Sequence, residues 1–150
     1  MSKDIAEQGY TVINLNFRYL PEHNLATHYH DCVKCINYCL SKAELFGIDR
    51  NHLFIAGDSS GANMAALIGG RINANSFKIK GKLAGLLLFY GIYDLNNLST
   101  VDFHICNALH KGFEKIKGAG LKEFYRVYSP ITYISKNYPP CFITVSYTHL

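Results

Sequence analysis

The chain has 150 residues, of which 49% are apolar and 17% charged, and its mean hydropathy is +0.01. This composition is typical of one globular domain and excludes disordered, collagen-like and low-complexity chains. The net charge is only +4. Because the basic residues are scattered along the chain, this charge does not indicate a nucleic-acid-binding surface.

The hydropathy pattern indicates neither a membrane span nor a secretory signal. The longest apolar run, residues 83–90, has the length of a strand and is much shorter than a membrane-spanning helix. Residues 1–7 lack the apolar segment of a signal peptide. Together with an odd count of 5 cysteines, these observations favour a reduced, cytoplasmic setting.

The first third of the chain predicts a helix, a strand and a second helix. Residues 2–8 are similar to the last turns of a helix, which Gly9 would close. Residues 10–15 are rich in β-branched and aromatic side chains and predict a strand. Residues 25–45 place apolar side chains at three- and four-residue steps, which predicts an amphipathic helix.

The middle of the chain predicts a strand, a helix and a further strand. Residues 53–56 are wholly apolar, as expected for a strand buried on both faces of a parallel sheet. Residues 60–72 are rich in Ala, Met and Leu and predict a helix. Residues 83–90 predict the next buried strand.

The last third predicts a helical insert followed by a strand. Residues 95–128 predict one or two amphipathic helices broken at Gly118 and Gly120, and residues 141–144 begin a strand after two prolines. The alternation predicts the α/β class, with a mostly parallel sheet and helices on both faces. Because the pattern begins inside a helix and stops inside a strand, we expect an incomplete domain that lacks elements at both ends.

A Gly-x-Ser-x-Gly motif connects the strand before it to the helix after it. The motif is Gly57-Asp58-Ser59-Ser60-Gly61, in the strand–turn–helix context of a nucleophile elbow. In so tight a turn the flanking positions cannot carry large side chains, and we expect Gly57 and Gly61 to supply that room. Ser59 would then lie at the tip of the turn with its hydroxyl exposed.

The helix that follows the motif supplies the second element of this chemistry. The backbone N–H of Ser60, at the helix N-terminus, would donate to the oxyanion of a tetrahedral intermediate. A plain Ser/Gly turn and a phosphate-binding loop are the alternatives. A Walker loop is excluded because no Gly-Lys-Ser/Thr follows.

Four segments of the chain, in the same order as in the family, resemble the hormone-sensitive-lipase-like esterases of the α/β-hydrolase fold. Residues 57–61 are similar to the Gly-Asp-Ser-Ala-Gly elbow of that group, and residues 17–22 resemble its Tyr-Arg-Leu-Ala-Pro-Glu motif. Residues 46–49 fit the Gly-x-Asp sequence that leads into the elbow strand. Residues 129–130 and 139–140 resemble the segment before the catalytic acid.

The resemblance implies a serine carboxylesterase or lipase-like hydrolase of small acyl esters, with an acyl-enzyme on Ser59 and no metal or cofactor. It also implies a Ser–Asp–His triad in that chain order and an upstream His-Gly-Gly-Gly oxyanion loop. The loop would precede Met1 and the triad Asp would follow residues 141–144, with the His later still. We therefore expect this chain to lack the triad Asp and His and to be inactive by itself. Residues 96–128 would form part of a cap over the acyl pocket.

Two alternatives remain open at this stage. An amide hydrolase, such as a formamidase or a peptidase, shares the fold and the elbow with an esterase. A catalytically dead relative could instead serve as a binding module. The sequence does not indicate an oligomeric state.

The last six residues do not continue the family pattern, which requires a Gly and then an Asp. Residues 145–150 match what one frame of the transposon-end adaptor used in sequencing libraries encodes. We therefore expect residues 1–144 to be the native partial domain and this tail to be non-native. For the same reason we do not assign His149 as the catalytic His.

The cysteine pattern invites a metal interpretation that we do not favour. Cys32, Cys35 and Cys39 lie on one apolar face of the predicted helix. Reduced Cys behaves there as a small hydrophobe, whereas a structural zinc site requires a fourth ligand. We expect these three side chains to pack in the core.

Several histidines lie outside the elbow. We expect His23, His28 and His30 to be surface residues at a helix start rather than metal or substrate contacts, because a triad His would follow the nucleophile in the chain. His104 and His110 lie in the insert, where the pattern assigns them no role.

Two acidic residues are weaker catalytic candidates. Asp94 follows a strand end, where sites form in α/β folds, but the family acid follows the next strand, so neither Asp94 nor Asp31 is assigned. Arg18 and Glu22 are expected to tie their loop together by an ion pair.

Overall fold

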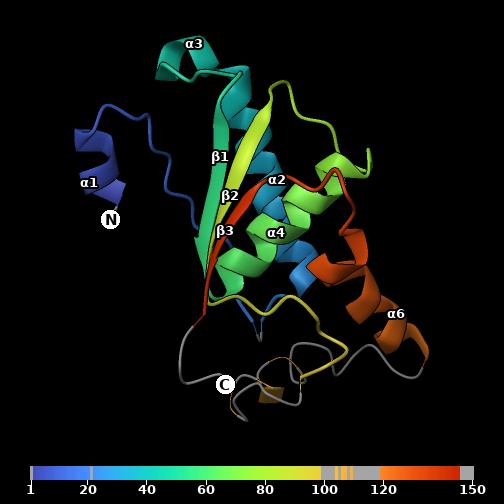
Figure 1. Cartoon of the computed structure of the whole chain (residues 1–150). Coiled ribbons are helices and arrows are strands. Elements are labelled where there is room, and N and C mark those ends of the chain that lie inside the picture. The colour runs from blue at the N-terminus through green and yellow to red at the C-terminus, as the bar shows by residue number, and fades with distance from the viewer. Residues whose placement is uncertain are drawn as a thin grey trace.

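A parallel sheet of three strands lies at the centre of the fold, with α4 packed against it (Figure 1). The computed structural model describes residues 2–20, 22–98, 104, 106, 107, 109 and 119–145. The elements are α1 (Ser2–Glu7), α2 (Leu25–Ser41), α3 (Ala43–Phe46), β1 (Leu53–Asp58), α4 (Ser60–Asn73), β2 (Leu83–Phe89), α6 (Ala119–Tyr128), the 3-10 helix η1 (Pro130–Tyr133) and β3 (Cys141–Thr144).

The strands lie in the order β1-β2-β3, and both pairs are parallel. β1 pairs with β2 from Leu53 opposite Leu83 to Asp58 opposite Phe89, with one register shift after Leu53. Three of the four predicted strands are therefore confirmed, and β1 continues two residues beyond the predicted end. Because all strands run in one direction, their carboxyl ends meet at a single edge of the sheet.

The strand predicted over residues 10–15 is wrong. This segment runs as an irregular chain apart from β1 in Figure 1, and Tyr10 and Ile13 are exposed. The Thr11 hydroxyl donates to the Gly47 carbonyl oxygen at 3.0 Å, which holds the segment near α3. β propensity is realised only when a neighbouring backbone completes a ladder, and no described strand pairs with these residues.

The long helix predicted over residues 25–45 is divided in two. α2 begins after Asn24, whose side-chain oxygen accepts a hydrogen bond from the Thr27 N–H at 3.1 Å, as an N-cap should. Lys42 separates α2 from α3, and Gly47 closes α3 at a φ of 63°. The conformation of Gly47 is the left-handed one that glycine adopts without strain.

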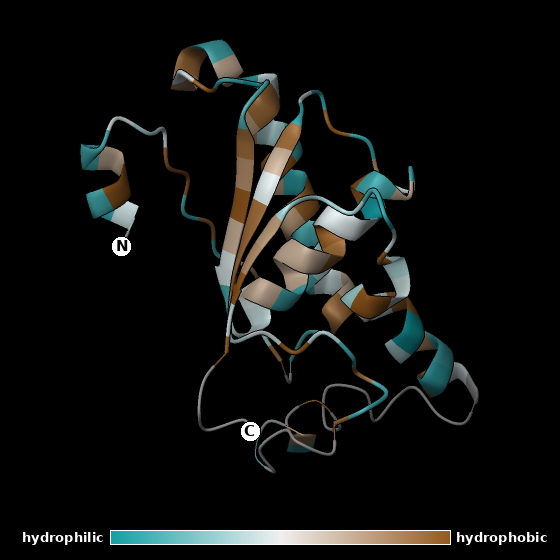
Figure 2. Cartoon of the chain, viewed as in Figure 1, coloured by the Kyte–Doolittle hydropathy of each residue, from teal (hydrophilic) through white to brown (hydrophobic). Residues whose placement is uncertain are grey.

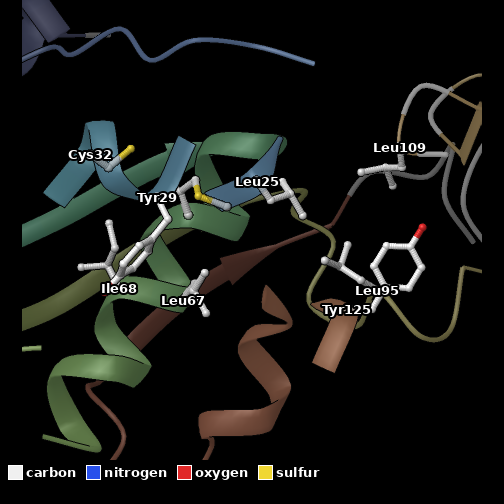
Figure 3. Packing of buried hydrophobic residues seen from close by; sticks show 9 residues of the cluster. Leu25, Tyr29, Cys32, Leu67, Ile68, Leu95, Leu109 and Tyr125 are labelled. Atoms are coloured by element: carbon white, nitrogen blue, oxygen red, sulfur yellow. The ribbon is translucent and has the colours of Figure 1, made fainter. Parts of the chain in front are cut away.

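The hydrophobic core lies between α2, α4 and α6. Figure 3 shows the Tyr29 ring of α2 beside Ile68 of α4, and Cys32 and Leu67 belong to the same buried cluster. All residues of α4 from 62 to 70 are buried, because the sheet covers one side of this helix and α2 and η1 cover others. This packing fixes the position of α4, and with it the first turn of the helix next to the end of β1.

Small residues let α4 approach the sheet and η1 closely. A Cβ added to Gly69 would lie 2.7 Å from Leu86 Cδ1, and one added to Gly70 would lie 2.6 Å from Tyr133 Cβ. Both distances are shorter than van der Waals contact, so these two glycines set the spacing between the layers.

The helices α2 and α4 lie on one side of the sheet (Figure 1). The other face exposes Phe54 and Phe142, each at 56%, and the Phe142 ring lies 6.2 Å from that of Phe89. β1 is thus half-buried on one face and exposed on the other, since half-buried and exposed residues alternate along it. Figure 2 shows that all three strands are apolar over most of their length.

The helical insert is described only in part. α6 runs from Ala119 to Tyr128 and contains Gly120, so the predicted break at Gly120 is wrong, while Gly118 lies outside the described residues. Figure 2 shows both hydrophilic and hydrophobic residues along α6, and Leu121, Phe124 and Tyr125 of this helix belong to the core or pack against it. Among the described residues, the helices are all too short or too polar to cross a bilayer.

Candidate active site

Ser59 occupies the turn between β1 and α4 in an unusual backbone conformation. β1 ends at Asp58 and α4 begins at Ser60, so a single residue makes the connection. Ser59 has φ 49° and ψ −116°, a positive φ that non-glycine residues rarely adopt. The side chain is exposed. Such strain persists only where the surrounding structure imposes it, and it concentrates at functional sites.

The neighbouring strand and the first turn of α4 both hold Ser59. Its N–H donates to the Phe89 carbonyl oxygen at 2.9 Å, and its own carbonyl oxygen accepts from the Asn63 N–H at 3.2 Å. The backbone on both sides of the hydroxyl is therefore fixed, one side to β2 and the other to α4. The hydroxyl itself lies at the carboxyl edge of the sheet, where ligands bind in α/β folds.

Gly57 and Gly61 contribute unequally to the room in this turn. A Cβ on Gly57 would lie 2.3 Å from the carbonyl carbon of Gly61 and 2.7 Å from the backbone N of Ala62. A Cβ on Gly61 would meet nothing closer than Asp58 Oδ1, at 3.8 Å. The sequence led us to expect that both glycines supply room, but only Gly57 must lack a side chain.

Ser60 is the first residue of α4, and its N–H points out of the helix N-terminus. Backbone N–H groups in the first turn have no partner inside the helix and carry the positive end of its dipole. Ser60 is exposed beside Ser59. A negative charge that develops next to the Ser59 hydroxyl would lie close to this donor.

Asp58 and Tyr90 form a cross-strand contact next to Ser59 that the sequence did not indicate. The Tyr90 hydroxyl donates to Asp58 Oδ2 at 3.1 Å, and this hydrogen bond together with the carboxylate charge raises the pKa of Tyr90. Tyr90 also has a positive φ of 44°, while its N–H donates to the Thr144 carbonyl oxygen at 2.9 Å. Strained residues thus follow both β1 and β2 at the same edge.

Asn63 is a further residue that sequence reasoning missed. It is 5% exposed, and its side-chain NH₂ donates to the Ile92 carbonyl oxygen at 2.6 Å. A Cβ on Gly91 would lie 2.7 Å from the Ala62 Cβ, so the loop after β2 packs tightly on the first turn of α4. The sequence signal that could have pointed to Asn63 is that it is the one polar residue of the stretch 62–70 of α4.

Asp94 and Ser129 have structural roles. Asp94 Oδ1 accepts the Asn96 N–H at 2.9 Å, as in a local turn. The buried Ser129 hydroxyl accepts the Leu95 N–H at 2.8 Å and donates to the Tyr125 carbonyl oxygen at 2.7 Å. The predicted segment at residues 129–130 therefore ties the loop after β2 to α6.

The predicted ion pair between Arg18 and Glu22 is wrong, because Arg18 pairs with Asp31. The Arg18 Nε and Nη2 donate to the two Asp31 carboxylate oxygens at 2.9 and 2.7 Å, and the Arg18 backbone N–H donates to Oδ2 at 3.2 Å. This fork holds the pKa of Asp31 well below its usual range. Asp31 therefore anchors the loop after residues 10–15 to α2.

The expectation that the three clustered histidines lie on the surface is wrong for one of them. His28 is 2% exposed, and its ring packs against Phe17 at 5.2 Å between centroids. Neither ring nitrogen has a hydrogen-bond partner. Burial lowers the pKa of His28. His23 is half-buried and His30 is exposed.

The cysteine prediction is confirmed for Cys32, which is 4% exposed within the core. Cys35 and Cys39 are half-buried beside it, and their sulfur atoms lie 3.9 Å apart. Among the described residues, no group of three or more His, Cys, Asp or Glu side chains is placed to hold a metal.

Some predicted residues lie outside the described part of the chain. His110 and His149 are among them, as are residues 146–150 of the predicted non-native tail. His104 is described and exposed. Among the residues that the structure describes, no Asp or His side chain forms a hydrogen bond with the Ser59 hydroxyl. The hollow lined by Asn96, Lys122, Glu123 and Arg126 includes no elbow residue.

Two proteins with similar sequences are esterases by name. Esterase LipC of Mycobacterium tuberculosis is 27% identical over 150 residues, which cover 91% of this chain and 36% of that protein. Esterase LipQ of the same organism is 23% identical over 144 residues, which cover 93% of this chain and 34% of that protein. The chain thus spans about a third of the length of these relatives.

Solved esterase structures share the fold. Esterase B from Lactobacillus Rhamnosis superposes with a TM-score of 0.79 at 17% identity, covering 95% of this chain and 47% of that one. An esterase from the archaeon Pyrobaculum calidifontis gives 0.64 at 20% identity, covering 85% of this chain and 43% of that one. The α/β-hydrolase fold expected from the motifs is therefore confirmed.

The family assignment rests on a match along nearly the whole chain. The sequence model of the BD-FAE family matches residues 1–147. Together with the named esterases, this match confirms the resemblance to hormone-sensitive-lipase-like esterases that the four sequence segments indicated. The chain belongs to the BD-FAE family.

Proposed function

We propose that this chain carries the nucleophile elbow of a serine hydrolase of small carboxylic esters, with Ser59 as the nucleophile. The observation that carries the proposal is the strained, exposed backbone of Ser59 at the single-residue turn from β1 to α4. A plain Ser/Gly turn would not require this conformation. The names of its relatives support an ester as the substrate.

The chemistry follows from what surrounds the Ser59 hydroxyl. Its oxygen attacks the ester carbonyl carbon, and the carbonyl oxygen takes up negative charge beside the Ser60 N–H. A donor of this kind lowers the barrier by about 3 kcal/mol. The alcohol leaves, an acyl-Ser59 ester forms, and water hydrolyses it.

The proton on the hydroxyl requires a base. By resemblance to the family, a His oriented by an Asp fulfils this role, and both would follow Thr144 in the complete protein. Without them a serine nucleophile retains only a small part of its activity. The chain of 150 residues should therefore show no turnover that depends on Ser59.

Reaction with a fluorophosphonate probe tests the proposal in the full-length protein. Ser59→Ala should abolish covalent labelling and lower the turnover of p-nitrophenyl acetate by about 10⁴-fold or more. Ser60→Ala is the matched control, because it removes a neighbouring hydroxyl and keeps the backbone N–H. Labelling should persist in this variant. Labelling that survives Ser59→Ala, or is lost equally in both variants, would contradict the assignment.

The same experiment separates the alternatives. A protein that labels at Ser59 but cleaves only amides would be an amide hydrolase, and one that does not label would be a binding module. The cytoplasmic setting and the non-native tail at residues 145–150 remain sequence-based proposals. Sequencing the source DNA beyond the codon for Thr144 should replace that tail with a continuation containing an Asp.

A further inference from the structure

Two cysteine side chains of α2 lie in contact with each other. Cys35 and Cys39 are four residues apart, and their sulfur atoms lie 3.9 Å from each other. Residues at this spacing are neighbours on a helix surface. Both side chains are half-buried, whereas Cys32, one turn earlier, is buried in the core. The pair is thus fixed by the helix and partly open to solvent.

The chemical state of the pair limits what it can bind. Both thiols are free, and burial together with the neighbouring Cys39 raises the pKa of Cys35. A divalent metal requires deprotonated sulfur, which the raised pKa of Cys35 opposes. A soft centre that condenses with two S–H groups has no such requirement and suits a pair of thiols.

We propose that Cys35 and Cys39 form a dithiol site for trivalent organoarsenicals. In the reaction with an arsenoxide, the two S–H bonds and the arsenic–oxygen bond break, and two arsenic–sulfur bonds form. Both protons leave with the oxygen as one water molecule. Arsenic remains trivalent, so no oxidant or reductant is consumed. The site is separate from Ser59 and does not depend on the proposed hydrolase function.

The advantage of the pair over a single thiol is the proximity of the second sulfur. Once one sulfur has reacted, the other is present at an effective concentration in the millimolar range or above. The helix has already ordered both side chains, so little further entropy is lost. Cys141 offers the contrast, because it is exposed and its thiol donates to the Pro139 carbonyl oxygen rather than meeting a second thiol.

The test uses phenylarsine oxide and the full-length native protein, with glutathione at about 0.1 mM, below the effective concentration of the second sulfur. After gel filtration, the arsenic retained per chain is measured for the protein and for its variants. The variants Cys35→Ser and Cys39→Ser should each retain one arsenic atom fewer per chain than the unmodified protein. Cys141→Ser and Cys32→Ala should lose none.

A spacing variant guards against misfolding of the single substitutions. Asn37→Cys combined with Cys39→Ser keeps the number of thiols but moves one to the exposed Asn37 position, two residues from Cys35. At that spacing the sulfurs point to different sides of the helix, so retention should fall at least about tenfold. Circular dichroism checks that each variant is folded. Retention in Cys39→Ser or in the spacing variant, loss in Cys32→Ala, or no retention in the unmodified protein would overturn the proposal.

Discussion

The Tyr90 hydroxyl donates a hydrogen bond to Asp58 Oδ2 at 3.1 Å and so joins the ends of β2 and β1 directly beside Ser59. The carboxylate stabilises the protonated phenol and raises the pKa of Tyr90. Asp58→Asn should lower that pKa towards its ordinary value, because the negative charge is removed while an acceptor oxygen stays.

The measurement is a titration of tyrosine absorbance at alkaline pH. The curve of the same protein with Tyr90→Phe is subtracted, so that the difference reports the Tyr90 phenol alone. Asp58→Asn should move the difference curve to lower pH, and Asp94→Asn, a neighbouring carboxylate with its own partner, should not. An unmoved curve in Asp58→Asn would show that the contact is absent in solution.

A second prediction concerns the two glycines of the elbow. Gly57→Ala forces a Cβ against the backbone of Gly61 at 2.3 Å, and backbone cannot rotate away as a side chain can. We expect a loss of about 3 kcal/mol in the free energy of unfolding, the upper end of overpacking. Urea denaturation measures it.

Gly61→Ala is the matched control. Gly61 lies inside α4, and its added methyl group would have Asp58 Oδ1 as nearest neighbour, at 3.8 Å. The variant should be unchanged or gain up to about 1 kcal/mol, because alanine favours helix over glycine. Equal destabilisation by the two substitutions would contradict the geometry of the turn.

The parts of the fold that local pattern could predict are those with strong apolar periodicity. The apolar runs at residues 53–56 and 83–90 predicted the strands β1 and β2, and the apolar periodicity from residue 25 predicted the start of α2. Residues 10–15 have the composition of a strand, but a strand also requires a neighbour, and composition does not contain that information.

The position of Ser59 at a turn from strand to helix was predictable, but the contacts around it were not. Ser59 stands in a motif with strict spacing, whereas the bond from Tyr90 to Asp58 depends on the register between two strands. In the same way, Arg18 has Glu22 near it in sequence but Asp31 near it in space. Contacts between distant segments of this kind require the assembled fold.

His28 yields a third prediction, on pH dependence. Its ring is buried, and neither nitrogen has a hydrogen-bond partner. Burial is the largest influence and lowers the pKa of His28, while the His23 backbone and the Asp31 charge oppose it only in part. In the unfolded chain the imidazole takes up a proton near pH 6.5. The unfolded state therefore binds more protons below that pH, and stability falls as the pH decreases from about 6.5 towards the lowered pKa.

His28→Leu should remove the fall in stability below pH 6.5 that His28 causes. It should also raise the free energy of unfolding above pH 7 by about 1 kcal/mol, because it leaves no buried polar atom unpaired. Urea denaturation at pH 8 and pH 5.5 measures both effects. His30→Leu is the control on the same helix, because His30 is exposed. If the two variants respond alike to pH, His28 is not buried as a neutral ring.

The last prediction concerns Arg71, which joins three helices near the end of α4. Its guanidinium lies 4.2 Å from the ring centroid of Tyr29, 5.0 Å from that of Tyr128 and 5.5 Å from that of Tyr133. It also donates to the Val127 carbonyl oxygen at 2.9 Å. Arg71 is half-buried, so aromatic rings and one carbonyl oxygen take the place of water around part of its guanidinium.

Arg71→Lys keeps the positive charge at the helix C-terminus, where it favours the dipole, but loses the planar group that can face several rings. We expect a loss of about 2 kcal/mol in the free energy of unfolding, as for a desolvated cation–π contact. Arg126→Lys is the control, because Arg126 pairs with Glu123 on the exposed side of α6 and such pairs contribute little. If the two substitutions lower the free energy of unfolding equally in urea denaturation, the aromatic rings around Arg71 do not stabilise the folded protein.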